Sequence, residues 1–158
     1  MSENTESSNI SVFTKEIVEL HEFFEEWFAG TCQQDEGYFQ KVMGSRFSPA
    51  FEIIFASGKR YPKNHLLEQL YKGYGHSPGF TIQIRNVQAR FLDKIEQFAL
   101  VTYEEWGKNA KNAISTNNGR ISSVLFQANA FAPNGFEWIH LHECWLPEEV
   151  VQAGNFDF

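Results

Sequence analysis

Two histidines separated by one residue, His140 and His142, are the first feature of this sequence that could do chemistry. They lie in residues 136–146, FEWIHLHECWL, where large side chains at both alternating sets of positions predict a β-strand covered on both faces. Alternate side chains of a strand share a face, so both imidazoles should project the same way, into a cavity or a dimer interface. Two imidazoles can share a divalent metal, but no third ligand stands at a recognisable spacing, so we predict no metal site.

A second candidate group is Tyr103-Glu104-Glu105, in a stretch with the period of a strand. Adjacent carboxylates on a strand face opposite ways, so Glu105 shares a face with Tyr103, and Glu104 shares one with Trp106. A carboxylate that faces an apolar pocket is partly desolvated, which raises its pKa and suits it to general acid or base chemistry near neutral pH. The alternative is that one glutamate is exposed and the other pairs with an arginine across the sheet.

The sequence carries no signature of a nucleophile or of a bound cofactor. It has no Gly-x-Ser-x-Gly nucleophile elbow and no glycine-rich phosphate loop. Cys32 and Cys144 lie far apart, which is typical neither of a disulfide framework nor of a thiolate zinc site. We therefore expect no cofactor.

The elements that must position these residues follow a simple order along the chain. Apolar residues at helical spacing between Thr14 and Gly30 predict a long amphipathic helix, with glutamates that include Glu16 on its polar side. Residues 63–73 predict a second helix, with Asn64 as its cap. From there the period is two and predicts four strands, at 81–91, 97–106, 121–130 and 136–146. Helices followed by consecutive strands indicate an α+β fold, with N-terminal helices packed on a curved, mainly antiparallel sheet.

The charge and the ends of the chain limit its partners and location. Residues 1–36 hold nine acids and one base, while the rest holds eleven acids and twelve bases, so the net charge of −7 is concentrated at the N-terminal side. Because the basic residues form no patch and no apolar run could span a bilayer, we expect neither nucleic acid nor membrane partners and a cytoplasmic location. We divide the chain into a flexible tail, a single domain and a C-terminal tail or edge segment, at residues 1–11, 12–147 and 148–158.

The order of elements, with LLEQL in the second helix, a strand ending TYEEW and a last strand containing WIHLHE, resembles the nuclear transport factor 2-like superfamily. Within this group of cystatin-like cones it is most similar to SnoaL-like proteins and to the association domain of calcium/calmodulin-dependent kinase II and its bacterial relatives of unknown function. The resemblance covers about residues 12–147 and implies a pocket between the first helix and the concave face, and pairing of two copies through their sheets. Glu143, Cys144 and Trp145 stand where the kinase domain has Arg and Ser, so its cationic pocket is not expected here.

These observations predict a small-molecule-binding domain with an aromatic pocket, since the chain has 16 Phe, 5 Tyr and 4 Trp. We expect a homodimer and a small apolar or mixed-polarity ligand. Any catalysis would be cofactor-independent acid/base chemistry of the isomerase, cyclase or dehydratase type; the alternative is a non-enzymatic dimerisation module. The residues assigned to catalysis are Glu104, His140 and His142, and those assigned to ligand binding are Trp27, Tyr103, Trp106 and Trp138.

Overall fold

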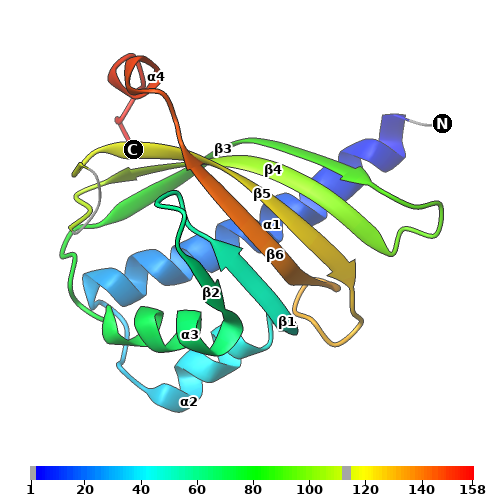
Figure 1. Cartoon of the computed structure of the whole chain (residues 1–158), viewed down its shortest axis with the longest axis horizontal. Coiled ribbons are helices and arrows are strands. Elements are labelled where there is room, and N and C mark those ends of the chain that lie inside the picture. The colour runs from blue at the N-terminus through cyan, green and yellow to red at the C-terminus, as the bar shows by residue number, and fades with distance from the viewer. Residues whose placement is uncertain (1–2, 112–114) are drawn as a thin grey trace.

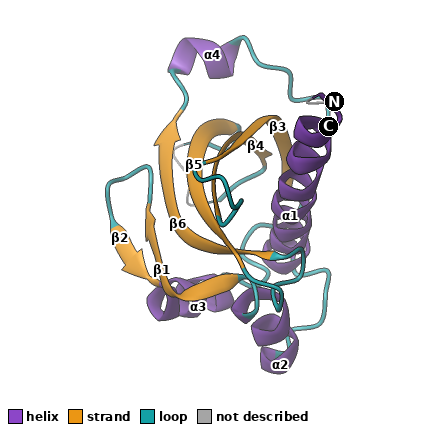
Figure 2. Cartoon of the chain, turned by 90° about the vertical axis from the view of Figure 1, so that its right-hand side faces the viewer, coloured by secondary structure: helices purple, strands orange, loops and turns teal. Residues whose placement is uncertain are grey.

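A six-stranded sheet curls around one long helix in the computed structural model of this protein, which describes residues 3–111 and 115–158 (Figure 1). The helix is α1 (Glu3–Ala29), and Figure 2 shows it lying along the concave side of the curved strands. The strands are β1 (Phe47–Ile54), β2 (Arg60–Pro62), β3 (Thr81–Phe91), β4 (Phe98–Lys108), β5 (Asn118–Ala128) and β6 (Phe136–Trp145). The shorter helices are α2 (Glu36–Phe39), the π-helix η1 (Gln40–Gly44), α3 (Lys63–Lys72) and α4 (Glu148–Gln152).

The strands are arranged in the order β2-β1-β6-β5-β4-β3. β1 runs parallel to β6, and the other neighbouring pairs are antiparallel. The four strands β3 to β6 begin and end within three residues of the predicted ones. The prediction of helices packed on a curved, mainly antiparallel sheet is thus confirmed.

A bulge in β6 changes which of its residues face the concave side of the sheet. Trp138 pairs with Phe126, but the next pair along is His140 with Leu125, so Ile139 is the extra residue. Trp138 and Leu141 are therefore both buried inward, although they are three positions apart. The expectation that alternate residues share one face along this whole strand is wrong, because one inserted residue exchanges the two faces beyond it.

Helix α1 begins earlier than its apolar pattern suggested. Residues 3–11 of the predicted tail are helical, and the Thr14 hydroxyl donates to the Ile10 carbonyl at 2.8 Å inside the helix rather than capping it. The helix ends at Gly30, whose φ of +73° is the left-handed conformation that glycine adopts easily. Its inward stripe is fully buried and forms the centre of the core, with Phe13, Ile17, Leu20, Phe23 and Trp27.

The polar side of α1 contains one glutamate that is buried instead of solvated. Glu16 is fully buried, and its Oε2 accepts hydrogen bonds from Arg46 Nη1 at 2.6 Å and Asn134 Nδ2 at 2.5 Å. Its Oε1 accepts from Trp138 Nε1 at 3.0 Å. The placing of Glu16 on the solvated face is therefore wrong, since this carboxylate joins α1 to the strand entry at Arg46 and to the β5–β6 connection.

The C-terminal segment folds back onto the sheet near Trp106. The ring of Trp106 packs against Phe156 with centroids 5.5 Å apart, and the Arg85 guanidinium lies 4.5 Å from the Trp106 ring centroid. Lys108 Nζ donates to the Phe156 carbonyl at 3.1 Å, which fixes the end of the chain against β4.

Among the helices of the described ranges, none combines the length and the apolar character needed to cross a bilayer.

Candidate functional site

An internal cavity of about 210 Å³ lies between α1, α3 and the concave face of the sheet. Most of its walls are apolar and many are aromatic, from Phe24, Phe28, Phe47, Ile53, Phe55, Leu66, Leu70, Phe80 and Ile82. Four elements contribute polar side chains to the same cavity: His21 from α1, Tyr103 and Glu105 from β4, Arg120 from β5, and Glu143 from β6. Polar groups that converge within an apolar cavity are typical of a ligand site.

The polar residues form a chain in which two carboxylates flank one guanidinium. Strand register places Glu105 directly opposite Arg120, and Arg120 Nη2 lies 3.3 Å from Glu105 Oε1. Arg120 Nη1 donates to Glu143 Oε2 at 2.9 Å. The Nε of Arg120 is buried and has no hydrogen-bond partner among the described residues. The guanidinium thus holds two carboxylates beside the cavity and keeps one donor unused.

His21 completes this chain from the helix side. Its Nδ1 donates to the Ile17 carbonyl at 2.6 Å, and its Nε2 lies 3.1 Å from Glu105 Oε2. A carbonyl and an ionised carboxylate only accept hydrogen bonds, so an imidazole that carries both protons satisfies both contacts. Since the imidazole of His21 is buried, it acts as a fixed donor to Glu105.

The two carboxylates of the cluster have pKa values that move in opposite directions. Burial favours the protonated form of Glu105, but the nearby charges of Arg120 and His21 outweigh it and lower the pKa of this carboxyl from 4.5 to about 2. Burial raises the pKa of Glu143, and the Glu105 charge adds to that effect, while Arg120 opposes it. A pair of carboxyls separated in this way can divide the roles of stable anion and proton carrier.

Tyr103 supplies a neutral hydroxyl to the same cavity. Burial, and then the charges of Glu105 and Glu143, raise the pKa of its phenol well above 10. Its ring lies against the imidazole of His21 at 5.6 Å between centroids, nearly perpendicular. The phenol therefore stays protonated at neutral pH and can donate a hydrogen bond.

Of the seven site residues predicted from the sequence, only Tyr103 lines this cavity. Glu104, His140 and His142 lie on the outer face of the sheet, where Glu104 accepts hydrogen bonds from Asn86 and from Trp106 Nε1. The three tryptophans are used elsewhere: Trp27 donates to the Leu70 carbonyl, Trp138 donates to Glu16, and Trp106 lies under the C-terminal segment. The catalytic role of the outer-face residues stays a prediction, and the structure separates them from the cavity.

The other polar residues of the cavity differ in how clearly the sequence indicates that they face inward. His21 stands within the apolar stripe of α1, and Glu105 shares a face with Tyr103, so both could be expected to face inward. Strict alternation along β6 places Glu143 on the face opposite His140 and His142. The bulge at Ile139 exchanges the two faces, so that Glu143 lines the cavity. Arg120 lies before the predicted start of its strand, and only the register of β4 and β5 reveals its partners.

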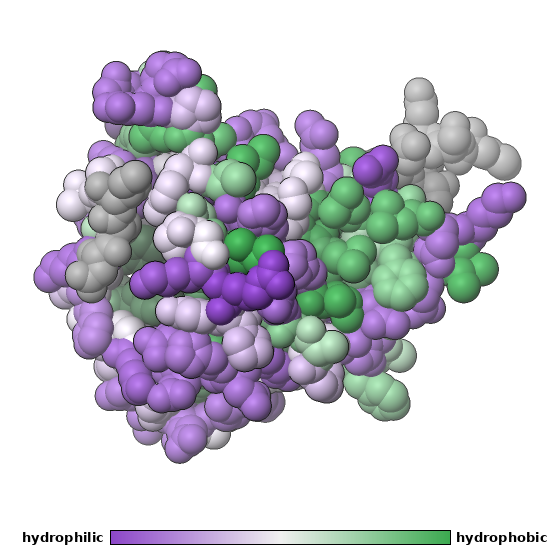
Figure 3. Space-filling view, viewed as in Figure 1, coloured by the Kyte–Doolittle hydropathy of each residue, from purple (hydrophilic) through white to green (hydrophobic). Residues whose placement is uncertain are grey.

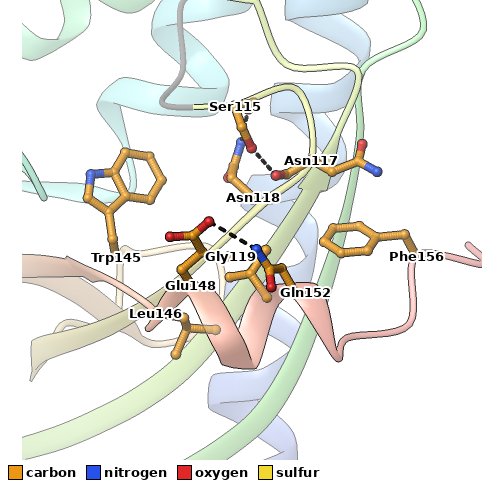
Figure 4. A pocket seen from close by; sticks show the side chains of 10 residues that line it. Ser115, Asn117, Asn118, Gly119, Trp145, Leu146, Glu148, Gln152 and Phe156 are labelled. Atoms are coloured by element: carbon orange, nitrogen blue, oxygen red, sulfur yellow. Dashed lines mark hydrogen bonds between the residues drawn. The ribbon is translucent and has the colours of Figure 1, made fainter.

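Two hollows of more than 600 Å³ among the described residues lie outside the inner cavity. One of about 630 Å³ shares Phe28, Phe55, Phe80, Arg120 and Glu143 with the inner cavity and forms its mouth. The other, of about 710 Å³, lies under α4 and is lined by the residues drawn in Figure 4. Its one charged lining residue, Glu148, bonds to Gln152 within α4, so this hollow lacks the converging charged groups of the inner cavity.

Solved structures place this fold in the nuclear transport factor 2-like, cystatin-like class. A nuclear transport factor 2-like protein of unknown function from Pseudomonas aeruginosa is 22% identical, with a TM-score of 0.71 over 86% of this chain and 99% of its own. An uncharacterised cystatin-like protein from Caulobacter vibrioides is 12% identical, with a TM-score of 0.62 over 89% and 94% of the two chains. The CaMKII hub of S. rosetta is 10% identical, with a TM-score of 0.60 over 84% and 95%. These likenesses show the fold alone.

The sequence itself identifies the family within this class. The model of the sucrose-6-phosphate phosphohydrolase C-terminal family matches residues 13–147, and the chain belongs to that family. A probable sucrose-phosphatase 3a of Arabidopsis thaliana is 24% identical over 135 residues, which are 84% of this chain and 30% of the plant protein. The chain thus spans less than a third of the length of this curated relative.

Proposed function

We propose that this domain binds a small molecule of mixed polarity, with several hydroxyl groups, in the cavity between α1 and the concave face of the sheet. The observation that carries the proposal is the buried Glu105–Arg120–Glu143 chain, which lines a cavity that is otherwise mostly aromatic and aliphatic. Ionised carboxylates only accept hydrogen bonds, so this cavity favours a ligand that donates them. The aromatic walls favour a body with apolar faces.

The cost of burying these charges supports a role in function. Replacing a buried ion pair by well-packed apolar residues is often neutral or stabilising, so such a cluster adds little to stability by itself. Here the cluster borders open space rather than closing it, and the pKa values of its carboxyls are shifted in opposite directions, downward for Glu105 and upward for Glu143. Altered pKa values within a cleft are typical of binding and catalytic sites.

The curated relative suggests which hydroxylated molecules to test first. Its name assigns it to sucrose phosphate chemistry, and this chain corresponds to less than a third of it. Neutral sugars combine hydroxyl donors with apolar C–H faces, which matches the two kinds of surface in the cavity. Sucrose and glucose are therefore the probes of choice, and a role as the sugar-binding part of a larger enzyme follows from the same proposal.

The cavity also has the groups needed for acid–base catalysis without a cofactor. Glu143, with its raised pKa, is suited to carry a proton, and the Tyr103 phenol is suited to donate to a developing oxyanion. Both side chains line the same cavity. Turnover of the bound molecule is an extension of the binding proposal and uses the same residues.

Replacing Glu143 by Gln should weaken binding of the neutral sugar by roughly tenfold or more, because a charge-assisted hydrogen bond is lost from the cavity. Binding is measured by saturation-transfer NMR and calorimetry with sucrose and glucose. Glu104→Gln is the matched control: it makes the same chemical change on the outer face of the sheet, away from the cavity. Equal weakening by both variants, or no saturation transfer with the unaltered protein, would contradict the proposal.

A second candidate function is self-association through the outer face of the sheet. In the view of Figures 1 and 3 this face is turned to the viewer, with α1 behind it and hydrophobic side chains gathered over part of it. Strand pairing places Ile121 beside Cys144, and Leu125 between Leu100 and His140. Ile121 is 42% exposed, and an apolar row on an uncovered sheet is a surface that a second copy can bury. The hub relative shares the fold and favours an assembly role.

Replacing Ile121 by Glu should convert a dimer to a monomer, since a carboxylate would be buried without a partner in the interface. The measurement is sedimentation equilibrium at several protein concentrations. Ile95→Glu is the control, because Ile95 is 80% exposed in the β3–β4 connection. The double variant His140→Ala, His142→Ala should also weaken the dimer. A wild-type protein that is monomeric throughout would disprove this second function.

A further inference from the structure

Arg120 has an aromatic contact in addition to its two carboxylates. Its Nη2 lies 3.3 Å from Glu105 Oε1 and its Nη1 lies 2.9 Å from Glu143 Oε2, while its Nε is buried and has no hydrogen-bond partner among the described residues. Arg120 Cζ also lies 5.3 Å from the ring centroid of Trp145. The face of an indole attracts a guanidinium at this distance, so the Trp145 ring is a third contact that holds Arg120.

The register of β5 and β6 places Trp145 at this point. Trp145 pairs directly with Arg120, and Glu143 stands two residues earlier on the same strand. Alternate residues of a strand share a face, so β6 presents Glu143 and Trp145 to Arg120 from the same side of the sheet. Trp145 also lines the mouth of the cavity and the hollow under α4, whereas the Arg120 side chain is only 22% exposed. The ring therefore limits the access of solvent to the guanidinium.

The orientation of the guanidinium decides how its charge is shared between the two carboxylates. Glu105 also contacts His21 Nε2 at 3.1 Å, whereas Arg120 is the one ion-pair partner that Glu143 has among the described residues. Tyr103 lines the same cavity and stays neutral. An arginine side chain has many rotamers, so contacts on several sides are needed to keep one orientation. A rotation of Arg120 toward Glu105 would leave Glu143 as a buried carboxyl without a partner.

We infer that Trp145 is a positioning residue of the candidate site: its ring fixes the Arg120 guanidinium between Glu105 and Glu143 and so keeps Arg120 bonded to Glu143. The inference rests on the proposed function for the use of Glu143 in ligand binding. The contact between Trp145 and Arg120 needs no ligand, and its effect on Arg120 and on Glu143 can be measured in the free protein.

The first test measures hydrogen exchange of the Arg120 Nε–H with water, by NMR of the isotope-labelled full chain. Exchange should be roughly tenfold faster in Trp145→Leu, because the guanidinium is free to turn toward water, and Trp145→Phe should restore it to within about threefold of the wild type. Trp145→Met replaces the leucine variant if that variant does not fold. Phe158→Leu is the control, since it removes an aromatic ring 5.6 Å from the Arg85 guanidinium and should leave Arg120 unchanged. Unchanged exchange in the aliphatic variants, or equal exchange in Trp145→Phe and Trp145→Leu, would overturn the inference.

The second test follows the titration of the Glu143 carboxyl by carbon NMR and the binding of glucose and sucrose by calorimetry. The titration midpoint should rise by about half a pH unit or more in Trp145→Leu, because Arg120 favours the ionised form of Glu143, and sugar binding at pH 7 should weaken by roughly threefold or more. Trp145→Phe should restore both properties.

The two tests separate this inference from the proposed function. If sugars bind and respond to Glu143→Gln, but the exchange of Arg120 and the titration of Glu143 are the same in Trp145→Leu as in the wild type, the positioning role fails and the proposed function stands. If both signals change as expected but neither sugar binds to the wild type, the proposed function fails and the positioning role stands.

Discussion

Replacing Arg46 by Met is expected to lower the free energy of unfolding by about 3–5 kcal/mol, the range for removing one partner of a buried ion pair. Arg46 Nη1 contacts Glu16 Oε2 at 2.6 Å, and the two side chains are 9% and 1% exposed. Without the guanidinium, Glu16 keeps only the neutral donors Asn134 and Trp138. A buried charge that lacks its counter-charge has to be protonated or exposed, and either change destabilises the fold.

Urea unfolding followed by circular dichroism measures the effect of Arg46→Met, and a second arginine provides the control. Arg60 pairs with Glu52 at 3.5 Å, with side chains that are 65% and 36% exposed. Arg60→Met makes the same chemical change at the surface and should cost less than about 1 kcal/mol. If the two variants lose similar stability, the buried Glu16–Arg46 contact stabilises the fold no more than a surface ion pair does.

The double variant Glu16→Gln, Arg46→Met separates the loss of the contact from the cost of the orphaned charge. It removes both charges, so its loss of stability should be smaller than the sum of the two single losses. A strictly additive result would show that the two groups act independently, contrary to their geometry. The measurement is the coupling free energy from the complete mutant cycle.

The sequence predicts much of this fold because its local patterns agree with the final contacts. Residues 81–91 alternate on each side of a bulge at Asn86–Val87, and the predicted strand coincides with β3. The apolar stripe of α1 is long enough to identify the helix, but it does not locate the start of the helix. The helix begins eleven residues before Thr14, the predicted cap. Element type therefore follows from periodicity, and element boundaries depend on contacts that periodicity does not contain.

The candidate site was harder to predict because it depends on pairing between distant segments. The bulge at Ile139 exists in relation to β5, so the sequence of β6 alone places His140 and His142 on the same face as Trp138 and Glu143 on the other. Glu16 looks like its solvated neighbours on α1 until Arg46 and Asn134, 30 and 118 residues away, are brought to it. Buried charges follow their partners rather than the hydropathy pattern.

Glu105→Gln is expected to lower the free energy of unfolding by about 3 kcal/mol at pH 7, because a pKa lowered from 4.5 to about 2 stabilises the ionised folded state by roughly that amount. The folded pKa lies below the unfolded value, so this stability is present above the unfolded pKa and is lost as the pH falls toward the folded one. The difference in free energy of unfolding between the wild type and Glu105→Gln should therefore decrease as the pH falls from about 5 to about 3. Urea unfolding at a series of pH values measures it.

Glu143→Gln should show the opposite dependence on pH. Because its folded pKa is raised, the stability that Glu143 contributes is present below the unfolded pKa and is lost as the pH rises through the folded one. The free energy of unfolding of Glu143→Gln should therefore increase relative to that of the wild type as the pH rises from about 4 toward 7. If both variants change in the same direction over this range, the opposite pKa shifts assigned to Glu105 and Glu143 are wrong.

The two variants together distinguish a structural role from a functional one. Glu105 anchors the cluster by contact with His21 and Arg120, and its loss should reduce both stability and binding. Burial raises the pKa of Glu143, so its carboxylate form costs stability, and Glu143→Gln should combine unchanged or increased stability at neutral pH with weakened sugar binding. That combination is the usual sign of a residue retained for function, whereas a loss of stability without a loss of binding would make Glu143 a structural residue.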